Sequence, residues 1–204
     1  MRPIGVPIAS ATFTVARAGF AALVAALVVA APHGARADEK VWALMKMPGH
    51  IVLLRHSYAP ESPPDTDLVN LKNCKTQRNL DETGRAHARR LGDEFRKHGI
   101  KRAVIHSSQY CRTLETARLL KLGPVKELPA LNQTFFAKPG EMREAATKTI
   151  AFMKTLPAKQ LAVLVTHVTN IQAVAGVMVA SGELAVVRFG PSGDVVADGR
   201  IKLP

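Results

Sequence analysis

Short, continuously apolar runs recur along the chain and predict buried β-strands. Each run holds three to five mostly β-branched or aliphatic residues, which suits a strand covered on both faces better than a helix. The runs are residues 51–54, 103–105 and 161–165, with a shorter extended piece around residues 125–128. Two further runs, residues 185–189 and 195–201, flank a Pro-Ser-Gly turn and predict a closing hairpin.

Apolar residues repeat at helical spacing between these runs. Gly84, Ala88, Leu91 and Phe95 are spaced 4, 3 and 4 residues apart, which predicts one face of a helix that Gly99 ends. Further helices are predicted at residues 42–47, 109–120, 141–156 and 171–179. This alternation of strands and helices predicts an α/β protein, a three-layer αβα sandwich around a mostly parallel central sheet.

The first 37 residues have the pattern of a secretory signal peptide. Arg2 and Arg17 give a positive start, and the apolar run at residues 18–31 has the length of a signal-peptide hydrophobic region. A comfortable membrane span needs about 20 apolar residues. Small residues at Ala35 and Ala37 predict cleavage after Ala37, which leaves residues 38–204 as one periplasmic or secreted domain with no stable membrane span. The alternative is an uncleaved membrane anchor.

Basic residues outnumber acidic ones, with 28 Lys and Arg against 16 Asp and Glu and a formal net charge of +12. The first 37 residues hold three arginines and no acid, so removing them lowers the charge from +12 to +9. Outside the cytoplasm, such a charge favours small anions or an anionic membrane surface. Nucleic acid is not expected, because no aromatic-and-basic binding motif is present. Much of the charge can equally be a solvated face of the helix predicted at residues 84–97.

The two cysteines, Cys74 and Cys111, allow one disulfide. An even number of cysteines in an oxidising compartment is typical of a paired bridge. The alternative is that both are unpaired, small apolar side chains. A bridge would connect the loop after the first strand to Cys111, the residue before Arg112.

Three of the predicted strands lead into side chains that suit a phosphoryl group. Arg55 and His56 follow the first strand, Arg112 lies shortly after the second, and His167 follows the strand at residues 161–165. Ligands of such sheets bind beyond the carboxyl ends of the strands, so we expect these side chains to converge. Arginine binds phosphate oxygens with a two-pronged fork, and a neutral imidazole can attack phosphorus. Each residue alone has an ordinary structural explanation, but together they predict a phosphoryl-transfer site.

Four segments resemble motifs of the histidine phosphatase superfamily, the phosphoglycerate mutase-like clan. Residues 53–57 (Leu-Leu-Arg-His-Ser) resemble its Arg-His signature, and residues 80–86 resemble its helix start, Leu-Thr-x-x-Gly-x-x-Gln-Ala. Residues 107–117 are similar to its Ser-x-x-x-Arg-x-x-Glu-Thr-Ala element, and residues 164–167 to the strand with its second histidine. The resemblance covers about residues 49–182 and implies a phosphoglycerate mutase-like fold.

The resemblance implies a metal-independent, histidine acid phosphatase-like phosphomonoesterase that needs no cofactor. His56 would attack phosphorus and become a phosphohistidine. Arg55 and Arg112 would bind equatorial oxygens, and His167, charged in the complex, would donate to the transferring group. The chain also shows no Cys/His or carboxylate cluster with metal-ligand spacing.

These motifs leave the general acid open. Gln133 stands where the mutase branch has Glu, and an amide cannot protonate an alkoxide. Val168 stands where another branch keeps an Asp. The remaining candidates are Glu141, which we take first, and Asp65 and Asp67. A poor acid would favour substrates with good leaving groups.

Two functions therefore remain for the site. With its predicted export and short loops, the chain resembles phosphatases of lipopolysaccharide-core sugars or small phosphohistidine-type phosphatases. The main hypothesis is therefore a periplasmic phosphomonoesterase that acts on small phosphorylated anions. Ser57, Asn79 and Gln133 are its candidate substrate-binding residues. The missing Glu keeps open a second function, a non-catalytic phosphoanion-binding module of the cell envelope.

Overall fold

The structure is a computed structural model that describes residues 33–61, 64–65 and 70–203, with side chains from residue 38 onward. Most of the predicted signal peptide, residues 1–32, lies outside these ranges, so export stays a prediction. The predicted cleavage point after Ala37 falls within helix α1 (His33–Leu44). Within the described ranges, no helix has the length and apolarity to cross a membrane.

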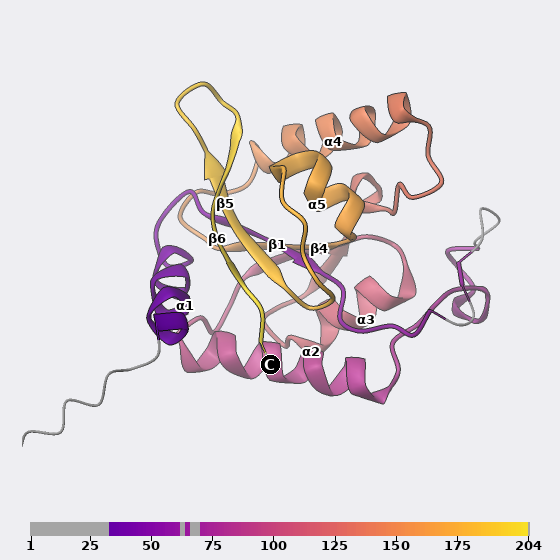
Figure 1. Ribbon diagram of the computed structural model, residues 1–204, viewed down its shortest axis with the longest axis horizontal. Helices are drawn as coiled ribbons and strands as arrows, with labels where there is room; N and C mark the ends of the chain where they lie inside the picture. The colour runs from indigo at the N-terminus through magenta and orange to yellow at the C-terminus, as the bar shows by residue number, and fades with distance from the viewer. Residues whose placement is uncertain (1–32, 62–63, 66–69, 204) are drawn as a thin grey trace, which may run out of the picture. The chain divides into compact units, whose positions relative to one another are not determined.

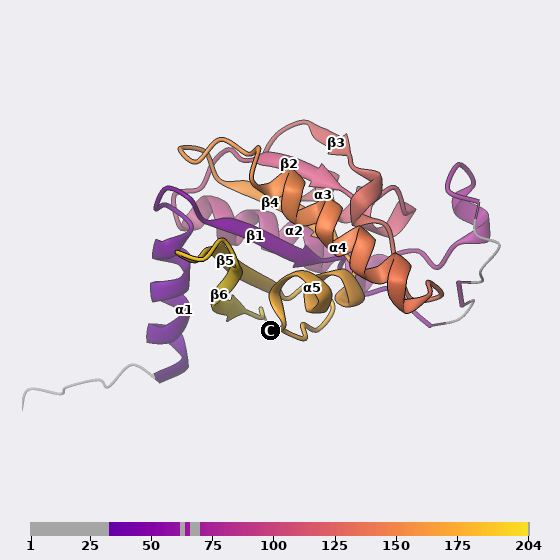
Figure 2. The ribbon, with the colours of Figure 1, turned by 90° about the horizontal axis from the view of Figure 1, so that it is seen from above.

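A sheet of six strands lies at the centre of the described chain (Figure 1), in the order β3-β2-β4-β1-β5-β6, which Figure 2 shows. Four strands run parallel: β1 (Ile51–Arg55), β2 (Val104–Ser107), β3 (Val125–Glu127) and β4 (Ala162–Thr166). The hairpin strands β5 (Leu184–Phe189) and β6 (Val195–Ile201) extend the sheet antiparallel beyond β1. The mixed, mostly parallel sheet confirms the predicted fold class.

Helices cover both faces of this sheet, which makes the three layers (Figure 2). One face packs against α1, α2 (Glu82–Lys97) and α3 (Cys111–Leu119), and the other packs against α4 (Pro139–Met153) and α5 (Val168–Ala175). Strand β1 shows why, since Val52 and Leu54 join one apolar core while Ile51 and Leu53 join the other. Short 3-10 turns at η1 (Cys74–Thr76) and η2 (Pro129–Leu131) complete the elements.

Two helices differ most from the sequence-based prediction. Helix α1 covers His33–Leu44 instead of residues 42–47, and Val41 and Trp42 of this helix, with Met45 just after it, are buried in the core. Helix α5 begins directly after His167 and ends at Ala175, because Gly176 takes a left-handed conformation with φ of 69°. The prediction placed this helix about three residues too late.

The start of α2 lies against the segment that follows His56. Asp81 caps the helix, and its Oδ1 accepts a hydrogen bond of 2.8 Å from the backbone N–H of Gly84. A side chain at Gly84 would bring its Cβ within 1.9 Å of the Tyr58 carbonyl oxygen. The glycine therefore lets the helix approach the site closely.

Candidate active site

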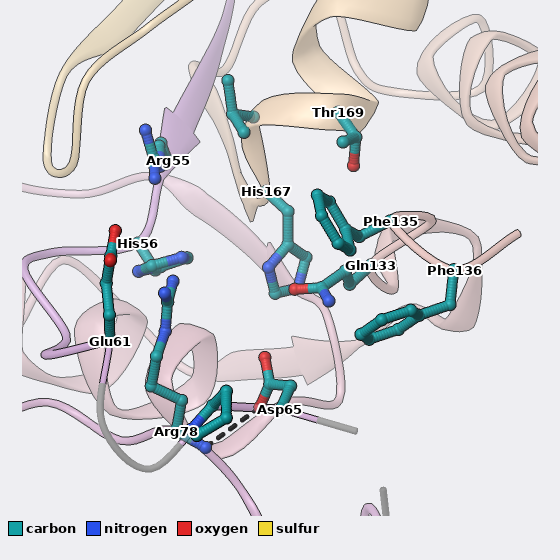
Figure 3. A pocket seen from close by; sticks show the side chains of 12 residues that line it. Arg55, His56, Glu61, Asp65, Arg78, Gln133, Phe135, Phe136, His167 and Thr169 are labelled. Atoms are coloured by element: carbon teal, nitrogen blue, oxygen red, sulfur yellow. Dashed lines mark hydrogen bonds between the residues drawn. The ribbon is translucent and has the colours of Figure 1, made fainter. Parts of the chain in front are cut away.

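The carboxyl ends of β1, β2 and β4 bring the four predicted residues together. Arg55 ends β1, His56 follows it, Arg112 lies in the first turn of α3 after β2, and His167 follows β4. The rings of His56 and His167 have centroids 5.5 Å apart, and Arg112 Nη2 lies 3.4 Å from His167 Nδ1. Arg55, His56 and His167 line a cavity of about 360 Å³ (Figure 3).

Among the residues that the structure describes, one ring nitrogen of His56 has a hydrogen-bond partner and the other has none. Its Nδ1 lies 2.7 Å from the carbonyl oxygen of Ser57, so Nδ1–H donates there and Nε2 keeps its electron pair. Burial, and then the positive charge of Arg112, hold the pKa of His56 well below its ordinary value. The imidazole is therefore neutral, the form that can act as a nucleophile.

The tautomer of His167 follows from its two partners. A guanidinium only donates, so His167 Nδ1 accepts from Arg112, and Nε2–H donates to Ser108 Oγ at 2.9 Å. Burial first and Arg112 second lower the pKa of His167 well below its ordinary value. In the free protein His167 is neutral, and a bound dianion would favour its charged form.

Asp65 holds the guanidinium of Arg112 in a two-point ion pair. Its Oδ2 lies 2.8 Å from Nη2, and its Oδ1 lies 3.1 Å from Nη1. The Oε1 of Gln133 also accepts from Nη2. Two of the residues selected from sequence, Asp65 and Gln133, are thus in the cavity wall, where they orient Arg112.

Comparisons with known proteins identify the family of the chain. The histidine phosphatase superfamily (branch 1) matches residues 51–150, the part of the chain that carries the Arg-His pair and Arg112. The chain belongs to the histidine phosphatase superfamily. No curated protein matches its sequence.

Solved structures share the superfamily fold at low identity. The protein histidine phosphatase SixA complexed with tungstate has a TM-score of 0.55 at 14% identity, covering 75% of this chain and 96% of that one. An Entamoeba histolytica phosphoserine phosphatase in complex with 3-phosphoglyceric acid has a TM-score of 0.56 at 13% identity, covering 76% and 97%. A mycobacterial glucosyl-3-phosphoglycerate phosphatase in complex with VO3 has a TM-score of 0.53 at 17% identity, covering 73% and 96%. These likenesses support the fold and say nothing about the substrate.

Arg78 is a third arginine at the candidate site, and the sequence patterns did not indicate it. It lines the cavity, and its charge lowers the pKa of both imidazoles. Its backbone N–H donates to Asp65 Oδ1 at 2.9 Å, and its carbonyl accepts from Arg112 Nη1 at 3.2 Å. Arg78 does not follow a strand, so the search at strand ends missed it. Its position just before the helix-start motif at residues 80–86 could have indicated it.

The predicted disulfide between Cys74 and Cys111 is present, with an S–S distance of 2.07 Å. It joins η1 to the first residue of α3, directly before Arg112. Gln77 Oε1 accepts from the Cys111 N–H at 2.9 Å, and Asn79 Nδ2 donates to the Cys74 carbonyl at 2.6 Å. Asn79 was expected to bind substrate, but its amide instead supports this loop.

The structure does not place Glu141 in the lining of the candidate cavity. Glu141 lies in the first turn of α4, where Oε2 accepts from the Lys138 N–H at 2.9 Å. Its carboxylate caps a helix, so its selection as general acid is not supported. Asp67 lies outside the described residues.

Two other placements bear on the chemistry. Ser57 Oγ is buried and has no hydrogen-bond partner among the residues described, while the Ser57 N–H donates to Thr116 Oγ1 at 3.0 Å. The cavity is also lined by Glu61, an exposed carboxylate that the sequence patterns did not indicate. Across the part of the chain that the structure describes, no three His, Cys, Asp or Glu side chains are placed to hold a metal ion.

Proposed function

We propose that the protein is a phosphomonoesterase that transfers a phosphoryl group to His56 and then to water. The observation that carries this proposal is the orientation of His56, whose Nδ1 is held by the Ser57 carbonyl while Nε2 is free. The low pKa of His56, due first to burial and then to Arg112, keeps that nitrogen unprotonated at neutral pH.

The arginines supply the charge for binding and transfer. Arg55, Arg78 and Arg112 would hold the phosphoryl oxygens while Nε2 of His56 attacks phosphorus and the ester oxygen leaves with its electron pair. Water then attacks the phosphohistidine, the phosphorus–nitrogen bond breaks, and phosphate and neutral imidazole are released. His167, 3.4 Å from Arg112, would gain charge as the dianion binds and would donate to the transferring group.

Protonation of the leaving group is the weak point of the site. Asp65 accepts hydrogen bonds from Arg112 and from the Arg78 backbone, so it acts as an acceptor. Glu61 lines the cavity but is exposed to solvent. We therefore expect turnover to rise as the leaving group needs less help from an acid, with phosphates of simple alcohols turned over more slowly than p-nitrophenyl phosphate.

The proposal includes export to the periplasm or secretion. It is supported by the signal-peptide pattern of residues 1–37 and by the disulfide, which persists in oxidising compartments. The substrate class is a small phosphorylated anion, of which a lipopolysaccharide-core sugar phosphate is one predicted member.

Hydrolysis of p-nitrophenyl phosphate tests the proposal, because its leaving group needs little protonation. We expect turnover by the wild type, an acid-labile phosphohistidine after rapid quenching, and a loss of about a thousandfold or more in His56→Ala. His98→Ala is the matched control, because His98 lies at the end of α2, outside the cavity lining. Turnover retained in His56→Ala would contradict the proposal.

Gln133 supports one alternative function, a module that binds phosphoanions without catalysis, because an amide cannot protonate a leaving group. Its Oε1 contacts Arg112 at the position where the mutase branch has a Glu. Vanadate binding by a wild type that does not turn over p-nitrophenyl phosphate would favour this second function.

A further inference from the structure

Two phenylalanine side chains at the mouth of the cavity are exposed to water. Phe135 is 69% exposed and Phe136 is 52% exposed, although both line the cavity that contains His56 and His167. The two rings pack edge to face, with centroids 5.1 Å apart (Figure 3). Exposed aromatic rings beside a functional group commonly mark a binding surface, because burying them on a ligand is favourable.

The elements of the active site hold this aromatic pair in place. Thr134, which precedes the pair, is buried, and its Oγ1 lies 3.1 Å from Thr169 Oγ1 and 3.3 Å from Asn170 Oδ1. Asn170 Nδ2 also donates to the Asn132 carbonyl at 2.9 Å. Thr169 and Asn170 belong to α5, the helix that starts after His167, so the rings keep a set position relative to that histidine.

The cavity therefore has a charged floor and an apolar mouth. Arg55, Arg78 and the two imidazoles form the floor, where a phosphoryl group fits. The side chains of Pro64, Val168 and the two exposed phenylalanines also line the cavity and offer no hydrogen bonds. The other polar lining residues are Glu61, Asp65, Gln133 and Thr169, and Asp65 and Gln133 already accept hydrogen bonds from Arg112.

The apolar mouth argues against the sugar phosphate named above as one member of the substrate class, because a sugar leaving group fits it poorly. Such a group would lose water from several hydroxyls and find few partners, which strongly disfavours binding. Thr169 contributes one hydroxyl, which already contacts Thr134. The exposed carboxylate of Glu61 would also repel a substrate with a second anionic group.

We propose that the leaving group of the substrate is hydrophobic, an aromatic ring or a hydrocarbon of similar size, and that it packs on Phe135 and Phe136. The inference rests on the proposed phosphomonoesterase function and names its substrate class. The two rings would select the leaving group, while the arginines and histidines of the charged floor would bind and transfer the phosphoryl group.

Alkyl phosphates with equally basic leaving groups test this inference. The purified full chain is assayed with 2-phenylethyl phosphate, ethyl phosphate and glucose 6-phosphate, which all release a primary alcohol. We expect kcat/KM for 2-phenylethyl phosphate to exceed that for the other two by about tenfold or more. The preference should lie mainly in KM, since the rings bind the part of the substrate that does not react.

Substitution of the rings should remove that preference. In the double variant Phe135→Ala/Phe136→Ala, the ratio of kcat/KM for 2-phenylethyl phosphate to that for ethyl phosphate should fall about tenfold. Phe135→Leu/Phe136→Leu should retain most of the ratio, because it keeps an apolar surface. Met47→Ala is the matched control, an exposed apolar side chain outside the cavity lining, and should leave the ratio unchanged.

The outcomes separate the two proposals. Equal kcat/KM for the three substrates, or an unchanged ratio in the alanine double variant, would overturn the hydrophobic leaving group and leave the phosphatase intact. Turnover of p-nitrophenyl phosphate with none of 2-phenylethyl phosphate would overturn a hydrocarbon alcohol as the leaving group. Failure to hydrolyse any of the three or p-nitrophenyl phosphate, with no phosphohistidine, would overturn the phosphatase itself.

Discussion

Burial and neighbouring positive charge keep both active-site imidazoles neutral. His56 is 2% exposed and His167 is 3% exposed, and burial followed by Arg112 lowers the pKa of each well below its ordinary value. A neutral His56 has its electron pair available without first losing a proton. The arginines can thus attract an anion while His56, the proposed nucleophile, stays unprotonated.

Asp65→Asn should strengthen the binding of anions. Asp65 occupies both terminal nitrogens of Arg112, so its negative charge opposes an incoming phosphoryl group. We expect the inhibition constant of vanadate to fall about tenfold, or ~1.4 kcal/mol. Glu61→Gln should change it less, because that carboxylate is exposed and screened by water. Weaker vanadate binding in Asp65→Asn would show instead that Asp65 mainly positions Arg112.

The sequence indicated the candidate site residues that lie at the ends of predicted strands. Arg55, His56 and His167 stand directly after apolar runs, and parallel pairing forces such residues to one edge of the sheet. Loops carry no periodicity, so most of their contribution to the cavity was missed, although Asp65 and Gln133 were selected. The missed residues are Arg78, Glu61, Phe135 and Phe136. The selection of Glu141 did not hold because a carboxylate near a helix start can serve as a cap.

Among the elements, strands were predicted more closely than helix ends. The observed β1 and β4 lie within one residue of the predicted apolar runs, because burial on both faces leaves a strong signal. The end of α5 depends on the left-handed conformation of Gly176, which an apolar pattern does not reveal. The three-layer architecture followed from the order of the elements.

Removing the disulfide should weaken both the fold and the site. The bridge closes a loop of 37 residues between η1 and α3, so Cys74→Ser/Cys111→Ser should lower the free energy of unfolding by up to about 4 kcal/mol. It should also raise KM for p-nitrophenyl phosphate about tenfold, since Arg78 and Arg112 would be less well positioned. Urea unfolding and steady-state kinetics measure the two effects. An unchanged KM in the folded variant would limit the bridge to a stabilising role.

For the molecule as a whole, the buried histidines make stability depend on pH. Burial lowers the pKa of His56 and His167, whereas in the unfolded chain each should titrate near about 6.5. As pH falls below about 6.5, the unfolded state takes up protons that the folded state cannot, so stability is lost. Each histidine should contribute up to about 1.4 kcal/mol per pH unit.

Urea unfolding between pH 7.5 and pH 5 measures this dependence. His87 and His106, whose pKa values burial also lowers, act in the same direction, so the informative quantity is the change in slope. His56→Ala should reduce the slope by about 1.4 kcal/mol per pH unit at most. An equal slope in wild type and variant would mean that His56 is protonated in the folded state.

The bridge between Cys74 and Cys111 also implies an order of events in the life of the molecule. A newly made chain carries two thiols, so no disulfide yet links the loop before Arg78 to the helix that contains Arg112. If the chain is exported as proposed, oxidants at the destination complete the anion site. The protein would reach its full affinity for phosphorylated substrates only after leaving the cytoplasm. Phosphorylated metabolites in the cytoplasm would therefore not be hydrolysed.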